Sequence, residues 1–406
     1  MSVPLPSPSS RPRRVADSHQ IVGAAFRLSA VFILWAAGWS VYRAFIPGSW
    51  WGPLHAFMVG GVLLAISGAT QLFSVTWAAA IPPDPRLALS QRWMLASGAA
   101  TAIAGVVWES TPVVVLGATL VGLGLLTLGW ILIGVTRRSL LKRFGLSSRF
   151  YLLGIAAGAI GVMLGGLIAS GSSGSRYLDF RVAHMHLNVV GLVGFTIVGT
   201  LPTILPTMVR HKMVSGREAV FGFWGSAAAL TVMAAGALAG PVVVGIGCGL
   251  AGVGSAATLV GIVVRLGVPK VLKSGLPALL VTSGSLWLIG WVFVESITLI
   301  GGHQAIWSRA TAVGVGGVAL VLFGSLAYLV PVLAGPGSSL AANFERMRGS
   351  PWARFALANG AVAAAALGLP GGVALVLGGA FLTDFGIRTI AVLTRRRRRN
   401  AAPSHG

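Results

Sequence analysis

The sequence predicts an all-α polytopic membrane protein, on the basis of its composition, the length of its apolar runs and a histidine-bearing segment that recurs along the chain. Hydrophobic residues make up 55% of the 406 residues and charged residues only 9%, with a mean hydropathy of +0.85. A soluble globular domain has a charged fraction of about 25%. The apolar runs are about 20 residues long, which is enough for a helix to cross the bilayer. They are continuous rather than alternating, so we expect helices and not a barrel.

Twelve such runs can be placed along the chain, and we expect each to be a transmembrane helix. Before them lies a tail, 1–20, rich in proline, serine and arginine, which we expect to be disordered and cytoplasmic. After the membrane domain, 21–394, comes a basic cytoplasmic tail, 395–406. The twelve predicted spans are 21–46, 53–80, 91–108, 112–135, 150–170, 181–208, 220–238, 241–264, 275–298, 303–334, 352–369 and 371–393.

One segment recurs in the second, sixth and tenth spans, which predicts a threefold internal repeat. The copies run from His55 to Trp77, from His186 to Met208 and from Thr311 to Leu333, at offsets of 131 and 125 residues. A Gly-small pair follows at the same position in each copy, thirteen residues after the first residue. The repeats then cover about 21–149, 150–274 and 275–394. Each repeat has four helices, an even number, so the repeats are parallel, unlike the inverted repeats of many transporters.

The net charge of +22 reflects topology rather than nucleic-acid binding. With the amino terminus inside, 26 of the 30 basic residues fall on the cytoplasmic side of the predicted helices. The positive-inside rule therefore predicts a multi-pass protein of the cytoplasmic (inner) membrane with both termini in the cytoplasm. The lipid bilayer is its expected surrounding, and no nucleic-acid partner is predicted.

Four of the seven histidines, His55, His184, His186 and His303, fall at the outer ends of spans two, six and ten. Ionisable side chains close to lipid are costly to keep and often functional. Neutral imidazole is also a common ligand of haem iron and copper. We therefore expect an outer-facing ligand cluster. The alternative is that these side chains lie at headgroup depth and bond only to water or backbone.

Two of these histidines lie in one helix and cannot both face the same centre. His184 and His186 are two residues apart, so in a regular helix they point in nearly opposite directions. The repeat register with His55 favours His186, and His184 would join only if the helix is not yet wound there or if it faces a second site. Asn188 is a candidate partner for a ligating imidazole. Glu295 is a candidate carboxylate that orients one through its other ring nitrogen, or else a plain interfacial anion.

The motif AHMHLNVVGLVGFTIVGTLPTILPTM, residues 183–208, resembles the HxHLNxxGxxGxTxxGTLxTxxPT signature of a group of actinobacterial membrane proteins, some of them fused to multicopper-oxidase domains. The twelve-helix pattern also resembles subunit I of the haem-copper oxidases and the NnrS-type membrane proteins associated with nitric oxide stress. These resemblances imply that His55 and His303 are the axial pair of a b-type haem. They imply that His186, with His184, binds copper, and that a periplasmic multicopper oxidase or other redox protein is the partner.

The chain departs from the oxidase pattern at several places. The segment from Val220 to Gly240 lacks the histidine pair expected on helix seven, and span six lacks a tyrosine beside its histidine ligand. We therefore expect no complete oxygen reductase, but a component of electron transfer, nitrogen-oxide handling or copper-oxidase-linked redox chemistry. Whether it is itself an oxidoreductase stays open. A small-molecule or ion permease, or a membrane scaffold for a periplasmic copper oxidase, are the alternatives.

Overall fold

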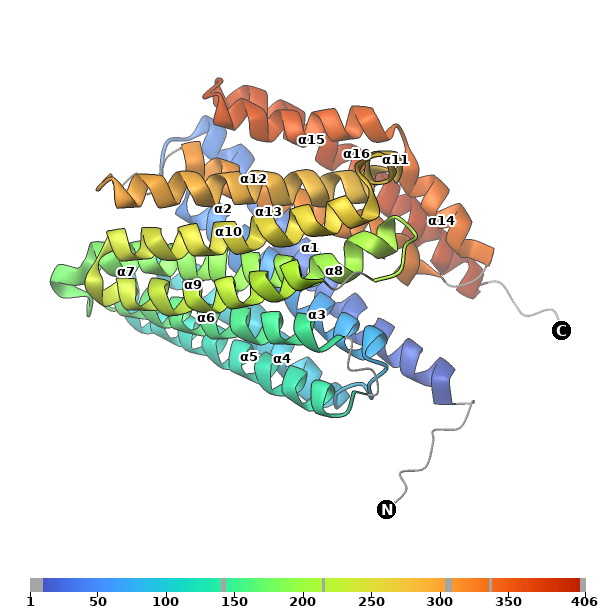
Figure 1. Ribbon diagram of the computed structural model, residues 1–406, viewed down its shortest axis with the longest axis horizontal. Coiled ribbons are helices and arrows are strands. Elements are labelled where there is room, and N and C mark those ends of the chain that lie inside the picture. The colour runs from blue at the N-terminus through green and yellow to red at the C-terminus, as the bar shows by residue number, and fades with distance from the viewer. Residues whose placement is uncertain (1–9, 140–143, 214–215, 304–308, 336–337, 402–406) are drawn as a thin grey trace, which may run out of the picture. The chain divides into compact units, whose positions relative to one another are not determined.

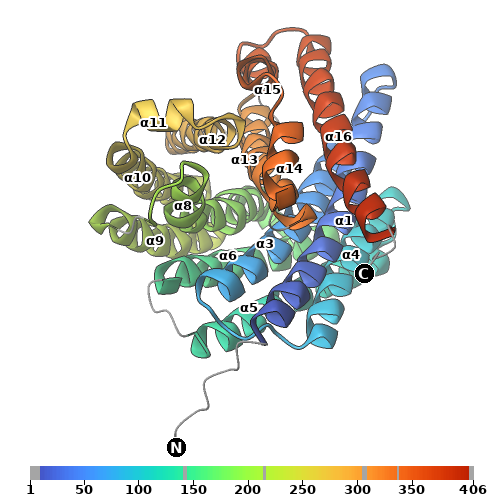
Figure 2. The same cartoon turned by 90° about the vertical axis from the view of Figure 1, so that its right-hand side faces the viewer.

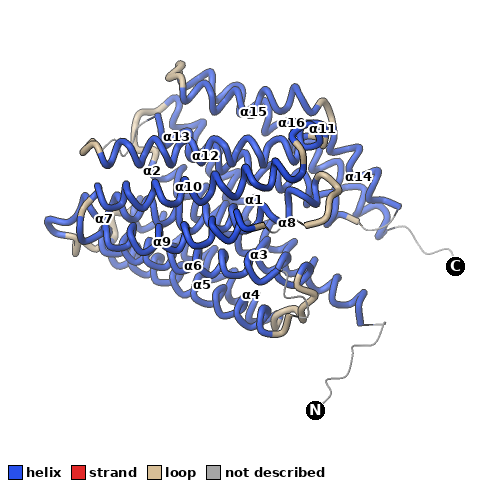
Figure 3. The backbone as a smooth tube through the Cα atoms, in the orientation of Figure 1, coloured by secondary structure: helices blue, strands red, loops and turns tan. Residues whose placement is uncertain are grey.

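The structure is a computed structural model that describes residues 10–139, 144–213, 216–303, 309–335 and 338–401 (Figure 1). Every regular element in these ranges is a helix, and Figure 3 accordingly draws no strand among them. The predicted all-α class is confirmed for this part of the chain.

Each of the twelve predicted runs contains helix among the described residues, and ten of the described helices are long and apolar enough to cross a membrane. The two others are α4 (Pro85–Val107), which contains Gln91 and Arg92, and α15 (Pro351–Ala366), which has only 16 residues. The chain is thus a polytopic helical membrane protein, and the count of twelve spans stays a prediction. The ten helices are Val22–Phe45, Trp51–Trp77, Thr111–Arg137, Gly145–Ala169, Gly174–Met208, Arg217–Ala239, Pro241–Leu266, Leu276–Ile300, Thr311–Ala334 and Gly371–Thr394.

Both predicted tails contain helix. The first helix, α1 (Ser10–Phe45), begins within the segment predicted to be a disordered tail, and the last, α16 (Gly371–Ala401), continues into the basic tail. Residues 1–9 and 402–406 lie outside the described residues. Two short helices, α11 (Val268–Lys273) and α14 (Ser338–Arg348), occupy segments that were predicted only as connections.

The chain divides into two compact units. The first comprises Met1–Gly199, Phe223–Leu250 and Leu299–Gly302, and the second comprises Thr200–Gly222, Ala251–Thr298 and His303–Gly406. These boundaries differ from those of the three predicted repeats, whose division of the chain stays a prediction.

Close helix packing through glycine builds the first unit, in which α4 and α5 (Thr111–Arg137) lie side by side (Figure 2). A Cβ atom on Gly105 would lie 2.5 Å from the backbone nitrogen of Val114, and one on Gly117 would lie 2.3 Å from that of Ala102. Only glycine permits this approach, which is a common way for helices to associate in lipid. The unit also contains α2 (Trp51–His55), η1 (Ala56–Val62), α3 (Leu63–Trp77), α6 (Gly145–Ala169), η3 (Gly174–Arg176), α7 (Tyr177–His186) and η4 (Leu187–Gly194).

Glycine contacts and a buried ion pair stabilise the second unit. A Cβ on Gly284 of α12 (Leu276–Ile300) would lie 2.7 Å from the carbonyl oxygen of Gly317 in α13 (Arg309–Ala334). The guanidinium of Arg354 is only 4% exposed and lies 2.6 Å from the carboxylate of Asp384 in α16. This pairing compensates the cost of burying the cation. Four of the described helices contribute residues to both units, namely α8 (Phe195–Met208), α9 (Arg217–Ala239), α10 (Pro241–Leu266) and, with its last two residues, α12.

Candidate functional site

Two imidazoles from distant parts of the chain face each other in the first unit. His55 is the last residue of α2 and His184 lies in α7, and their ring centroids are 6.4 Å apart with 12° between the ring planes. The indole of Trp51 stacks on the imidazole of His55, with the ring centroids 3.9 Å apart and 20° between the ring planes. The two histidine rings are therefore nearly parallel but too far apart for the face-to-face contact that Trp51 makes. Both side chains are half-buried.

The backbone fixes the tautomer of each of these rings. The Nδ1 atom of His55 lies 2.8 Å from the carbonyl oxygen of Trp51, and that of His184 lies 2.7 Å from the carbonyl oxygen of Gly161. A carbonyl oxygen can only accept, so in both rings Nδ1 carries the hydrogen and donates it. In the neutral imidazole the other nitrogen, Nε2, then holds the lone pair. Metal-ligating histidines are commonly fixed in this way, through a hydrogen bond from the ring nitrogen that does not bind the metal.

Two glycines of α6 form the floor on which His184 lies. A Cβ on Gly165 would come within 2.7 Å of Cε1 of His184, and one on Gly161 would come within 2.4 Å of Nδ2 of Asn188. Gly161 also supplies the carbonyl oxygen to which His184 donates. Because the two glycines are four residues apart, they lie on one face of α6. This face positions the imidazole and the amide together.

A π-helix follows directly after a histidine in two places. The helix α2 ends at His55 and η1 begins at the next residue, and α7 ends at His186 and η4 begins at the next residue. The wider hydrogen bonds are visible at the ends, where Leu63 donates to Met58 and Phe195 donates to Val190, each five residues back. Single π turns inside α-helices occur frequently at functional sites.

His186 reproduces the conformation of His55, as its position in the repeat predicts. Its Nδ1 donates to the carbonyl oxygen of Val182, four residues back, at 2.8 Å, just as His55 donates to Trp51. However, the imidazole beside His55 belongs to His184 and not to His186, which the register had favoured. The reason is the regular winding of α7, which turns the two side chains to different faces. His186 is completely buried.

The remaining candidates lie as follows. Asn188 donates from Nδ2 to the carbonyl oxygen of His184 at 2.7 Å, so it supports His184 through the backbone. Glu295 is a buried residue of α12. His303 was predicted to begin the tenth span, but it lies in the turn after α12. It is exposed there, and its backbone N–H donates to the carbonyl oxygen of Thr298. The following residues, 304–308, lie outside the described part.

Among the residues that the structure describes, no three His, Cys, Asp or Glu side chains lie close enough to hold a metal ion together. His55 and His184 are the two predicted ligand residues that the structure brings together. The ligand roles of all four histidines stay predictions.

Two features of the site were missed at the level of sequence. Trp51 was not expected to contact His55, although a residue four positions earlier on a helix lies on the same face. Gly161 and Gly165 of α6 were not predicted to belong to the site, although their four-residue spacing was an available signal.

No known protein family matches this chain, and no curated protein matches it either. The chemistry of the site therefore has to be inferred from its own side chains.

Proposed function

We propose that the protein is a cytoplasmic-membrane redox protein that binds copper or haem at an outer-facing site formed by His55 and His184. The observation that carries this proposal is the pair itself, two nearly parallel imidazoles whose Nδ1 hydrogens are both held by backbone carbonyls. Twelve membrane spans in three parallel repeats, with both termini in the cytoplasm, form part of the proposal.

The donor set fits a copper ion. Both Nε2 atoms are neutral donors, and imidazole is a suitable ligand for copper. In each ring Nδ1 holds the backbone hydrogen bond, which leaves Nε2 as the nitrogen that would bind the ion. When bound, such an ion would supply one-electron redox chemistry. The role of the residues is to fix the two nitrogens, with Trp51 covering one ring and α6 carrying the other.

The same two imidazoles would also suit haem iron, for which histidine is a common ligand. The resemblance to the haem-copper oxidases supports a b-type haem, with His303 as the alternative partner of His55. Haem and copper have different absorption spectra, so one preparation distinguishes them. A half-buried site at the outer rim would exchange electrons with a periplasmic partner such as a multicopper oxidase.

The test is metal analysis and absorption spectroscopy of the full chain, purified in mild detergent from cells supplied with haem and copper. We expect either stoichiometric copper or a Soret band that shifts on reduction with dithionite. A folded, monodisperse preparation with neither rejects the proposal. The control is the double variant with alanine at His55 and His184, which should contain neither copper nor haem. Its yield in the membrane fraction reports whether the fold is retained.

A further inference from the structure

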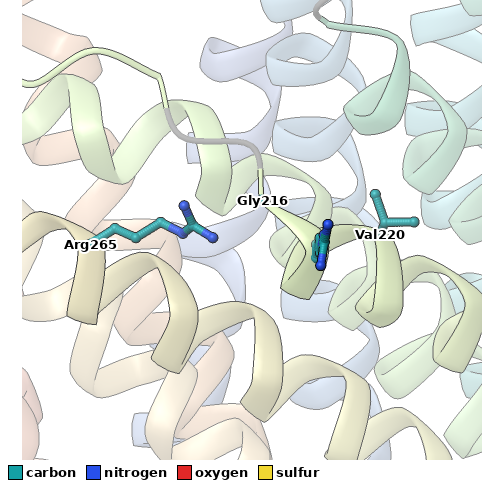
Figure 4. Close-up of a pocket in the computed structure, with 4 residues that line it drawn as sticks. Gly216, Val220 and Arg265 are labelled. Atoms are coloured by element: carbon teal, nitrogen blue, oxygen red, sulfur yellow. The ribbon is translucent and has the colours of Figure 1, made fainter.

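A second concave site lies at the predicted inner end of two neighbouring helices, where α9 begins and α10 ends (Figure 4). It is an open depression of about 510 Å³ lined by Gly216, Arg217, Val220 and Arg265, all in the second unit. Binding pockets for small ligands have volumes of about 300–1,000 Å³. The depression is therefore large enough for a compact polar group.

The lining is cationic, and one of its cations is held in place. Both Nε and Nη2 of Arg265 donate to the carboxylate of Glu218, at 2.7 and 2.9 Å, a two-point contact that fixes the plane of the guanidinium. Glu218 lies against Gly216 and Gly261, where a Cβ atom would collide with it. Arg217 brings a second guanidinium to the same wall, so two cations and one carboxylate leave the site positive. The amino-terminal end of α9 adds the partial positive charge of its backbone amides.

The surroundings of this cationic site are apolar. Val220 is 46% exposed, Phe221 is 55% exposed and Val264 is 68% exposed, all on the helices that form the depression. The neighbouring short helix α11 adds Lys270 and Lys273 to the same predicted side of the membrane. A molecule that complements both the cationic depression and the apolar surface around it has an anionic headgroup and hydrocarbon chains.

We propose that this depression binds the phosphate of an anionic phospholipid, with Arg217 and Arg265 contacting the headgroup and its chains lying along the exposed apolar residues of α9 and α10. Basic pockets between helices on the cytoplasmic side are a known form of lipid-headgroup site. The exposed apolar surface favours a lipid over free phosphate, and the two-point contact with Glu218 distinguishes Arg265 from a freely moving surface cation. The inference does not depend on the histidine site.

The test titrates the detergent-solubilised full chain with phosphatidylglycerol, phosphatidylcholine or inorganic phosphate, and follows the apparent melting temperature and lipid retention by native mass spectrometry. The key variant is Arg217→Gln, which leaves the pair of Glu218 and Arg265 intact. Its matched control is Lys212→Gln, which removes one positive charge from an exposed residue of the same connection that does not line the depression.

We expect phosphatidylglycerol to raise the melting temperature of the natural chain, and phosphatidylcholine and inorganic phosphate to leave it unchanged. Arg217→Gln should weaken the apparent affinity for phosphatidylglycerol about tenfold, the effect of losing one charge-assisted hydrogen bond to the headgroup. Lys212→Gln should stay close to the natural chain. Equal weakening in both variants would show diffuse attraction of lipid to the positive surface and not a specific site. A response to inorganic phosphate equal to that for phosphatidylglycerol would show that the depression binds a free anion and not a lipid. Absence of any response to phosphatidylglycerol overturns the proposal as well.

Discussion

The segments that begin at His55 and His186 differ from the one that begins at Thr311 in a single respect of backbone geometry. In the first two, the histidine ends an α-helix and a π-helix follows, whereas α13 is a continuous α-helix. All three have glycine at the same position, at Gly60, Gly191 and Gly316. The π turn therefore accompanies the histidine and not the glycine. Because π turns in α-helices often mark functional sites, the difference supports placing the proposed site in the first two copies.

The glycines themselves have a packing role in all three copies. A Cβ on Gly60 would collide with the ring of Phe32, one on Gly191 with Ala157 and one on Gly316 with Val362. Close approach of a neighbouring helix is thus common to the three segments. What is special to the first two is the hydrogen bond from the imidazole to the carbonyl four residues back.

The largest expected effect separates the two histidines of α7. Replacing His184 by alanine should lower the affinity for the bound metal by more than about 100-fold, because loss of a ligand exceeds the loss of a partner that only orients one. His186→Asn should keep most of the metal, since the ring beside His55 in the structure is that of His184. Metal content per purified chain measures both. The reverse result would show that the repeat register, and not the observed ring pair, identifies the ligand.

A smaller effect is expected from the floor beneath His184. Gly165→Ala places a methyl group 2.7 Å from Cε1 of a ring whose Nδ1 is held by Gly161, so we expect a loss of about 1–3 kcal/mol in stability and weaker metal binding. The neighbouring substitution Gly166→Ala is the control, because its new Cβ meets nothing nearer than 3.6 Å. It should gain up to about 1 kcal/mol from the lower flexibility of alanine in the unfolded chain. Apparent melting temperatures in detergent compare the two, and equal values would contradict the close contact.

A side chain of another helix donates a hydrogen bond to the π-helix η1 of the first copy, which gives a third test. The hydroxyl of Ser29 in α1 donates to the carbonyl oxygen of Gly61 at 2.8 Å, in buried surroundings. Ser29→Ala should lower stability by about 1 kcal/mol, a typical value for a hydrogen bond between helices in a membrane protein. Ser40→Ala, whose hydroxyl bonds within its own helix to Ala36, should change stability less. A larger loss from Ser40→Ala would mean that the bond to Gly61 does not stabilise the π turn.

The smallest effect is expected in the third copy. Thr311→His restores the missing histidine on a helix without a π turn, and we expect no additional metal to bind. The metal-to-protein ratio of this variant should equal that of the natural chain. A gain of one metal ion per chain would break the link between the π-helix and binding.

The sequence was sufficient to predict the helices because lipid leaves the backbone no other partner than itself. The run predicted at 112–135, for example, is found as α5, Thr111–Arg137. It could not reveal the π turns, since the segment Ala56–Val62 is apolar throughout and its pattern is compatible with either winding. The short helix α14 was missed for a different reason, because its polar sequence resembles a connection.

The site was predictable as a set of residues but not as an arrangement. The outer-end histidines were identified by position, but the repeat register favoured His186, whereas the structure brings His184 beside His55. The choice between them depended on a third helix, α6, whose Gly165 leaves the gap that the ring of His184 fills and whose Gly161 accepts its hydrogen bond. Which helix lies opposite a given face is set by tertiary packing, and no local pattern in the chain encodes it.

The contacts of α6 have a mechanical consequence. Gly161 binds the ring of His184 through its carbonyl, while Gly165 supports that ring from below, so the imidazole is attached to α6 as well as to α7. Rotation of α6 about its axis would bring a side chain under the ring and pull the carbonyl away at the same time. Any partner or lipid that twists α6 would therefore change the distance between the two imidazoles, and with it the affinity of the proposed site for its metal or haem.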